Sequence, residues 1–172
     1  MPSKTYKGKL FEQDIKNSAE KQGLYFLRLK DSSQSFEQMN QIKGGYSWNN
    51  PYDCLIYGEN KLFAIEMKST KESNISFKMI RDNQIDGLLK AKSYNICAGF
   101  LFNFRDDENK NSNDNVTYWM PINNFMNFKN NTNKKSINKN DICDFGGVVL
   151  TQKLKRVRYE YDIRELIKYG DF

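Results

Sequence analysis

Three side chains that could combine metal binding with proton chemistry lie close together in the chain: Asp53, Glu66 and Lys68. Carboxylate oxygens are hard ligands of the kind that Mg²⁺ and Mn²⁺ prefer. A lysine beside two such ligands can orient or deprotonate a water molecule, or neutralise charge that develops on a phosphate. The set therefore suggests a metal site that acts on a phosphate ester, with Asp53 and Glu66 as metal ligands.

The segments that carry these residues have the pattern of a β-hairpin. Apolar and aromatic residues flank the sequence Gly58-Glu59-Asn60, which is typical of a short hairpin turn. Side chains alternate between the faces of a strand, so Glu66 and Lys68 share one face, and Asp53 opens the partner strand at the same end. From these residues alone, a frayed hairpin end with a solvated Glu–Lys pair remains the alternative interpretation.

Composition limits the chemistry further. The chain of 172 residues contains no histidine, which excludes Ser-His-Asp and Cys-His catalysis and His-ligated zinc. Cys54, Cys97 and Cys143 are far apart and lack a C-x-x-C spacing, so we interpret them as reduced thiols. An enzyme built from this sequence would depend on carboxylates, lysines and a metal.

Net charge and hydropathy indicate the kind of partner. The net charge of +6 and the pI of about 9.1 favour an anionic partner, with nucleic acid first. The abundance of Lys, Asn and Ile also fits AT-rich coding, so charge alone gives modest support. No apolar run approaches the roughly 20 residues of a membrane span, and the first residues lack an apolar signal core. We therefore expect a cytoplasmic protein without membrane contact.

The rest of the pattern predicts one α/β domain over residues 1–172, in which a mixed sheet is flanked by helices. Its core should cover about 8–128, followed by a C-terminal extension, 129–172, in which 130–140 is expected to be mobile and 141–150 irregular. Residues 31–50 are polar and longer than an ordinary connection, which suggests a short stalk or a DNA-contact loop. The expected helices are 9–22, 77–93, 122–128 and 163–169, and the expected strands are 24–30, the hairpin 53–68, 95–106, 116–120 and 157–161.

Two further polar residues lie where they could reach the same site. Glu12 falls at the edge of the apolar stripe of the first helix, so it either points toward the sheet or is a solvated residue of the first turn. Gln84 lies within the apolar stripe of helix 77–93, where a buried amide needs partners. It either reaches the metal site or a phosphate, or is satisfied by the backbone.

Basic residues outside this site are candidates for phosphate contacts. The alternative for each is an ordinary solvated face. The candidates are Lys43, Lys71, Lys155, Arg156 and Arg158.

Several motifs in this order resemble the PD-(D/E)XK nucleases, and more closely the RecU-type Holliday-junction resolvases. Asp53 matches the first acid, and Glu66-Met67-Lys68 matches the E-x-K motif. Gly8 to Ile15 resembles the Gly-x-x-x-Glu opening helix of the resolvases. The segment after Glu66, through Asn83-Gln84-Ile85, resembles the region after their second acid. The resemblance extends from about residue 8 to residue 128.

The resemblance implies a homodimeric, structure-selective endonuclease that nicks two opposed strands of a four-way DNA junction with Mg²⁺ or Mn²⁺. Thr70 matches the family pattern and is counted among the DNA contacts. The residues carried over to the active site are the metal ligands Asp53 and Glu66, the water-activating Lys68, and the supporting Glu12 and Gln84. Such an enzyme would serve DNA recombination and repair in the cytoplasm of a bacterium or a phage-infected cell.

Two rival functions remain open. One is a PD-(D/E)XK endonuclease of another type, such as a restriction or repair enzyme, which would cut linear duplex. The other is a non-catalytic junction-binding protein that kept the fold, against which the presence of all three of Asp53, Glu66 and Lys68 argues.

Overall fold

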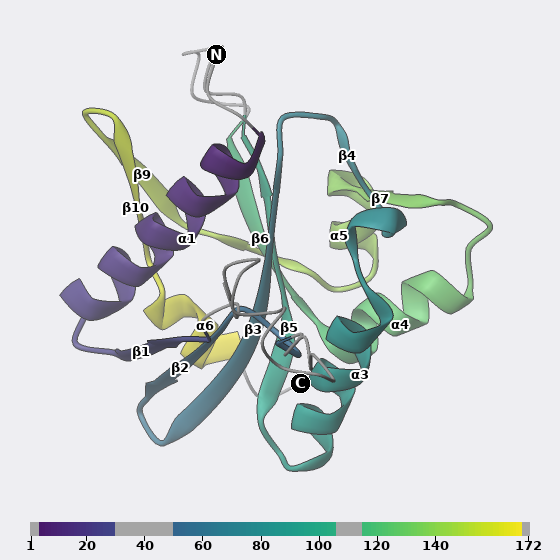
Figure 1. The fold of residues 1–172 in the computed structure, drawn as a ribbon, viewed down its shortest axis with the longest axis horizontal. Helices are drawn as coiled ribbons and strands as arrows, with labels where there is room; N and C mark the ends of the chain where they lie inside the picture. The colour runs from purple at the N-terminus through teal and green to yellow at the C-terminus, as the bar shows by residue number, and fades with distance from the viewer. Residues whose placement is uncertain (1–3, 30–49, 106–114, 170–172) are drawn as a thin grey trace, which may run out of the picture.

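A central β-sheet lies between two groups of helices in the computed structural model of the chain (Figure 1). The structure describes residues 4–29, 50–105 and 115–169. Lys43 and nearly all of the expected stalk, 31–49, lie outside these ranges. No helix in the described part of the chain combines the length and the apolar character that a membrane crossing requires.

Six strands form the central sheet, in the order β1-β2-β3-β5-β6-β8. They are β1 (Tyr25–Arg28), β2 (Cys54–Gly58), β3 (Lys61–Thr70), β5 (Cys97–Phe104), β6 (Val116–Pro121) and β8 (Val148–Leu150). Strands β3 and β5 are parallel, whereas the other neighbours are antiparallel. Parallel neighbours need a crossover connection, and α3 (Asp82–Ser93) lies within it. The predicted mixed α/β sheet is thus confirmed.

The hairpin between β2 and β3 has a two-residue turn. Gly58 pairs with Lys61, so only Glu59 and Asn60 remain in the turn, with φ angles of 49° and 63°. Positive φ at both central residues is what a type I′ hairpin turn requires. Gly58 itself is the last residue of the strand, where an added Cβ would lie 2.3 Å from the side chain of Leu24.

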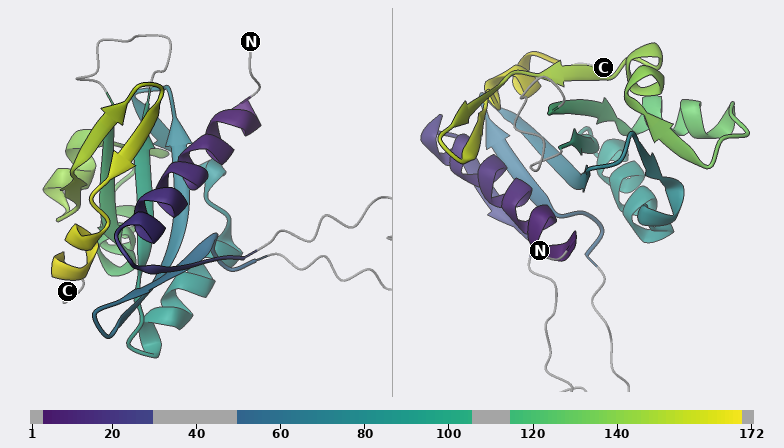
Figure 2. Two further views of the ribbon diagram at one scale, coloured as in Figure 1. Left: turned by 90° about the vertical axis from the view of Figure 1, so that its left-hand side faces the viewer. Right: turned by 90° about the horizontal axis from the view of Figure 1, so that it is seen from above.

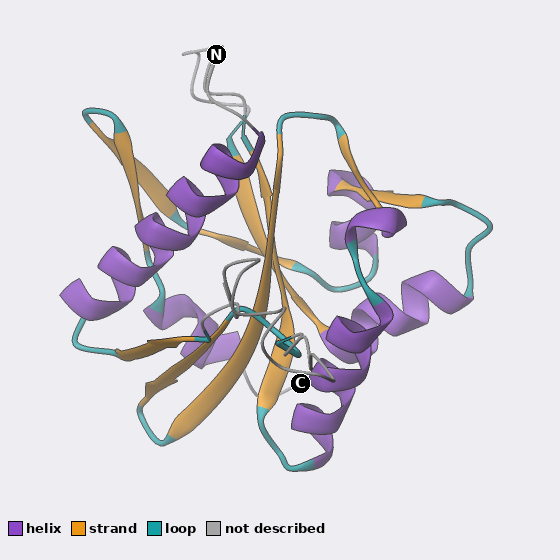
Figure 3. Cartoon of the chain, in the orientation of Figure 1, coloured by secondary structure: helices purple, strands orange, loops and turns teal. Residues whose placement is uncertain are grey.

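Each face of the sheet is covered by its own helices (Figures 2 and 3). The helix α1 (Lys4–Lys21) packs on one face, where Phe11 and Ile15 join Phe63 and Ile65 of β3 in a buried cluster. The helices α3 and α4 (Ile122–Asn130) cover the other face, whose cluster contains Ala64 from the same strand. The alternation predicted for β3 therefore places Glu66 and Lys68 on the α3 face, together with Ala64.

The structure corrects the predicted helix 77–93. Its first turn is a separate 3-10 helix, η1 (Phe77–Met79), for which the Ser76 hydroxyl caps the backbone N–H of Lys78 at 3.3 Å. The helix α3 then begins at Asp82, after an extended Arg81. The apolar spacing continues across the break because Ile80 is buried as well, so periodicity alone could not reveal it.

The expectation of an irregular stretch over 141–150 is wrong, and the segment 130–140 contains regular structure as well. The structure has β7 (Ser136–Asn138), α5 (Lys139–Asp144) and β8 there. The strand β7 pairs with β4 (Asn74–Ser76), so its partner lies far away in sequence. The chain then continues through β9 (Gln152–Lys155), which was not predicted, β10 (Arg158–Tyr161) and α6 (Arg164–Tyr169).

Candidate active site

The middle of β3 and the start of β2 bring the predicted acids and the lysine together. The Asp53 carboxylate accepts a hydrogen bond from the backbone N–H of Met67 at 2.7 Å, which fixes Asp53 beside the residue that separates Glu66 from Lys68. The Lys68 ammonium lies 2.7 Å from Glu66 Oε1. The predicted set Asp53, Glu66 and Lys68 is therefore one cluster on the hairpin.

Gln84 joins this cluster from α3. Its Nε2 donates to Glu66 Oε1 at 2.5 Å, and its Oε1 accepts from Lys68 Nζ at 3.2 Å. The same Oε1 also accepts from the backbone N–H of Arg81 at 3.0 Å, at the start of the helix. The amide thus contacts the acid and the lysine and also satisfies a backbone donor, and a role of Gln84 toward a metal or a phosphate stays a prediction.

Glu66 is the most unusual group in the cluster because it is only 1% exposed. Its Oε1 has both Lys68 and Gln84, whereas its Oε2 is buried without a hydrogen-bond partner among the described residues. Burial and the nearby Asp53 raise the pKa of Glu66 to about 7, against the opposing effect of Lys68 and Arg81. A buried carboxylate oxygen without a partner is costly, and a bound cation would relieve that cost.

The donor set fits a hard divalent cation. Within the described ranges, no cluster contains three or more His, Cys, Asp or Glu side chains that could hold a metal, so the protein offers two carboxylates, Asp53 and Glu66. Mg²⁺ typically binds through one or two carboxylates and leaves its other positions to water and substrate phosphate. The unpartnered Glu66 oxygen is the observation that supports such a site.

Glu12 lies at the same end of the hairpin but is held by another residue. It forms an ion pair of 2.6 Å with Arg28 of β1. Burial raises the pKa of the Cys54 thiol, and the negative charges of Asp53, Glu12 and Glu66 raise it further. Arg28 is a member of this group that the sequence did not single out.

The other predicted DNA contacts are distributed over two regions. Thr70 ends β3, where its hydroxyl accepts from the backbone N–H of Glu72 at 3.0 Å, and Lys71 is exposed in the turn that follows. Lys155 and Arg156 are exposed at the β9–β10 hairpin, which lies on the α1 side of the sheet (Figure 1), whereas Glu66 is on the α3 face. The structure does not bring these two to the acids.

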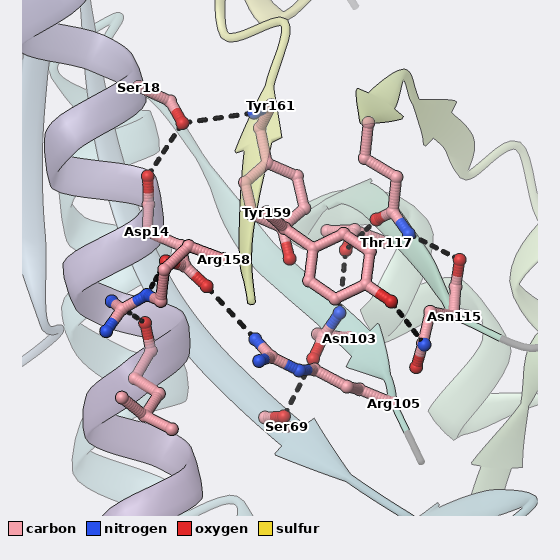
Figure 4. Close-up of polar contacts among 12 residues, drawn as sticks. Asp14, Ser18, Ser69, Asn103, Arg105, Asn115, Thr117, Arg158, Tyr159 and Tyr161 are labelled. Carbon is pink, nitrogen blue, oxygen red and sulfur yellow. Dashed lines mark hydrogen bonds and ion pairs between the residues drawn. The ribbon is translucent and has the colours of Figure 1, made fainter. Parts of the chain in front are cut away.

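Arg158 belongs to a buried polar network that sequence reasoning missed (Figure 4). Its Nε lies 2.5 Å from Asp14 Oδ1, and Arg105 Nη1 lies 3.0 Å from Asp14 Oδ2. The Arg105 guanidinium also stacks on the ring of Tyr159, 4.8 Å from its centroid. The phosphate contact proposed for Arg158 stays a prediction, and the guanidinium has a structural partner already.

The raised pKa of Glu66 predicts a specific pH dependence of stability without metal. Between its ordinary value of 4.5 and about 7, the folded protein keeps a proton on Glu66 that the unfolded chain has lost. Stability should therefore fall as pH rises through this window, and be fully present below it. Urea unfolding in EDTA measures the free energy of unfolding at several pH values. Between pH 4.5 and about 7, this free energy should fall by about 3 kcal/mol more for wild type than for Glu66→Gln.

The matched control for this measurement is Glu20→Gln, because Glu20 is an exposed acid of α1. This variant should keep the wild-type dependence on pH. Equal slopes for wild type and Glu66→Gln would mean that Glu66 is ionised throughout the range.

Comparison with known proteins first defines the class of fold. Hjc of Archaeoglobus fulgidus, a Holliday junction resolvase from an archaeal hyperthermophile, matches with a TM-score of 0.50 and 17% sequence identity. The match covers 78% of this chain and 90% of that chain. The chain thus has the mixed α/β fold of Hjc. No family model matches the sequence.

A second comparison gives the family. The SPbeta prophage-derived uncharacterized protein YotM of Bacillus subtilis (strain 168) is 38% identical to this chain, in an alignment that covers 92% of this chain and 84% of YotM. The chain belongs to the same protein family as YotM.

Proposed function

We propose that the protein is a metal-dependent DNA endonuclease that resolves four-way junctions, of the RecU type and active as a homodimer. The observation that carries the proposal is the buried Glu66, whose Oε2 has no hydrogen-bond partner in the described part of the chain, while Asp53 and Lys68 lie beside it. The resolvase-like fold supports branched DNA as the substrate. The place of action would be the cytoplasm of a bacterium or a phage-infected cell, in recombination and repair.

The residues of the site have separable roles. Asp53 and Glu66 would hold Mg²⁺ or Mn²⁺, which supplies Lewis-acid stabilisation of the phosphate and lowers the pKa of water. Lys68 would orient the attacking water and offset negative charge on the phosphate. Gln84 holds both Glu66 and Lys68 in place through one amide. With no histidine in the chain, no imidazole takes part.

The deciding experiment compares cleavage of a labelled four-way junction with that of the matching linear duplex, in Mg²⁺, Mn²⁺ or EDTA. We expect metal-dependent paired nicks on opposed strands of the junction and none on the duplex. Asp53→Asn should lower the cleavage rate at least about 100-fold, whereas Asp86→Asn, at an exposed position of α3, should leave it unchanged.

A second readout is independent of cleavage. A cation that binds only the folded protein stabilises it, by about 2.7 kcal/mol at 100 times its dissociation constant. Mn²⁺ should therefore raise the melting temperature of wild type and of Asp86→Asn, but not that of Asp53→Asn. Cleavage of duplex as well would mean an endonuclease of another type. Junction binding with neither cleavage nor metal stabilisation would mean a non-catalytic binding protein.

A further inference from the structure

A polar cleft of about 470 Å³ lies at the end of β3, just beyond the residues of the active site. The turn after β3, from Lys71 to Asn74, forms one wall, and the junction of β7 and α5, from Asn138 to Asn140, forms the other. Phe104 and Arg105, at the end of β5, also line it. The cleft thus combines segments that are far apart in sequence, and none of the predicted sites includes it as a unit.

The walls and the floor of this cleft are fixed to one another. Asn74 pairs with Asn138 in the β4–β7 ladder, which ties one wall to the other. The backbone N–H of Arg105 donates to the carbonyl of Thr70 at 2.7 Å, which ties the end of β5 to the end of β3. A ligand would therefore meet a preformed surface, and little conformational entropy would be lost on binding.

The charges in the cleft favour an anion. Lys71 is exposed on one wall, and Lys139 lies on the other with its ammonium 5.7 Å above the ring of Phe104. Among the described residues that line the cleft, Glu72 is the one acidic side chain, and amide and hydroxyl groups make up most of the rest. The Arg105 guanidinium is engaged with Asp14, and the two lysines add positive charge on both walls.

This lining distinguishes between classes of ligand. Sites for small organic molecules are mostly apolar, and Phe104 is only 2% exposed, so the cleft offers no aromatic face for stacking. In the described part of the lining, a metal would find a single carboxylate, that of Glu72. Two lysines on opposite walls, with amides between them, suit phosphate groups linked by a hydrophilic chain.

The position of the cleft relates it to the active site. Lys71 follows Lys68 by three positions in the chain, so their Cα atoms are at most about 11 Å apart. Successive nucleotides of one DNA strand advance by about 3.4 Å along the helix axis. If the scissile phosphate of a DNA strand lies at Lys68, the phosphate that reaches the cleft is therefore at most about three nucleotides away from it along the same strand.

We infer that this cleft binds the phosphate backbone of the DNA strand to be cut, within about three nucleotides of the scissile phosphate, through Lys71 and Lys139. The inference rests on the proposed nuclease function for the identity of the strand. It adds Lys139 and the β7–α5 junction to the DNA-binding surface, and it makes Lys71 part of a two-walled subsite.

The first test measures binding of a four-way junction in EDTA at several salt concentrations, for wild type, Lys71→Ala, Lys139→Ala and the double variant. The logarithm of the binding constant falls as the logarithm of the salt concentration rises, and each lost phosphate contact makes this negative slope shallower by about 0.9. We expect the slope to be shallower than that of wild type by about one unit in each single variant and by about two units in the double variant. The control is Lys90→Ala, an exposed lysine of α3 near the opposite end of the sheet, which should keep the wild-type slope.

A second arm locates the contact on the DNA. Uncharged methylphosphonates are placed one to three positions from the cleaved bond, on either side. Methylphosphonates on one side of the cleaved bond should weaken junction binding by wild type about 3- to 10-fold. The same methylphosphonates should not weaken binding by the Lys71→Ala, Lys139→Ala double variant. Equal effects on both proteins would show that those phosphates bind elsewhere and would overturn the inference.

These results separate the cleft from the proposed function. If wild type cleaves junctions but all lysine variants keep the wild-type slope, the cleft inference fails and the nuclease stands. If wild type does not cleave in either metal, yet the slopes fall as expected, the cleft stands as a DNA site on a non-catalytic protein. Circular dichroism melting of each variant ensures that a lost slope is not lost folding.

Discussion

Replacing Lys68 with alanine is expected to lower the rate of junction cleavage by about 10²- to 10⁴-fold, the range typical of a residue that takes part in proton transfer or charge stabilisation. Its ammonium is 2.7 Å from Glu66 Oε1 and its side chain is only 13% exposed. Water would replace it poorly, because water carries no charge. Single-turnover cleavage at saturating protein measures the effect on the chemical step alone.

Lys68→Arg separates the two roles that the Lys68 side chain could have, positive charge as the ammonium or proton acceptor as the neutral amine. Arginine keeps the positive charge but does not lose its proton in proteins. If Lys68 acts through its charge, Lys68→Arg should recover part of the lost rate. If it accepts a proton from water, Lys68→Arg should remain as slow as Lys68→Ala.

The readout must exclude a merely structural effect of Lys68. Lys68→Ala should bind the junction in EDTA within about 3-fold of wild type, because one phosphate contact of many is affected. Lys90→Ala, at the exposed position of α3, should cleave at the wild-type rate. Wild-type cleavage by Lys68→Ala would remove Lys68 from the mechanism and leave the lysine as a partner of Glu66 only.

The hairpin shows why part of this site was predictable. Alternation along β3 is a local property, so the sequence alone assigned Glu66 and Lys68 to one face, and Phe63 and Ile65 to the other. The position of Asp53 follows from the short turn between β2 and β3. Gln84 could be singled out because a polar residue interrupts an apolar helical stripe.

Features that depend on distant partners were not predictable. The strand β7 is only three residues long and pairs with β4, and no local pattern marks such a short pairing. Arg158 was assigned to DNA because a sequence displays charge but not the partner that neutralises it. Its partner, Asp14, is 144 residues away. The cleft at the end of β3 likewise exists only after β4 and β7 have paired.

Asp14→Ala is expected to destabilise the fold by about 3–5 kcal/mol, which is the typical cost of removing one partner from a buried ion pair. Asp14 is 1% exposed and is the common anion for Arg105 and Arg158. In Asp14→Ala, the Arg105 guanidinium would remain buried against the Tyr159 ring but would lose its ion pair with Asp14, which destabilises the folded state. Urea unfolding at neutral pH gives the free-energy difference.

The control is Glu20→Ala, which removes an exposed ion pair with Lys16 on the same helix and should cost less than about 0.5 kcal/mol. A double-mutant cycle with Arg158→Ala should show coupling of at least about 1 kcal/mol, because both residues belong to one network. Additive effects would mean that Arg158 contributes nothing through Asp14, and would free it for the phosphate contact that the sequence suggested.

The position of Asp14 gives this prediction a consequence for the active site. Asp14 ties α1 to β10 through Arg158 and to the end of β5 through Arg105, and Glu12 lies on the same helix. Asp14→Ala should therefore change cleavage only in proportion to the folded fraction, with recovery at low temperature or in a stabilising osmolyte. A cleavage defect that persists in fully folded Asp14→Ala would instead show that α1, and Glu12 with it, must be held in place for catalysis.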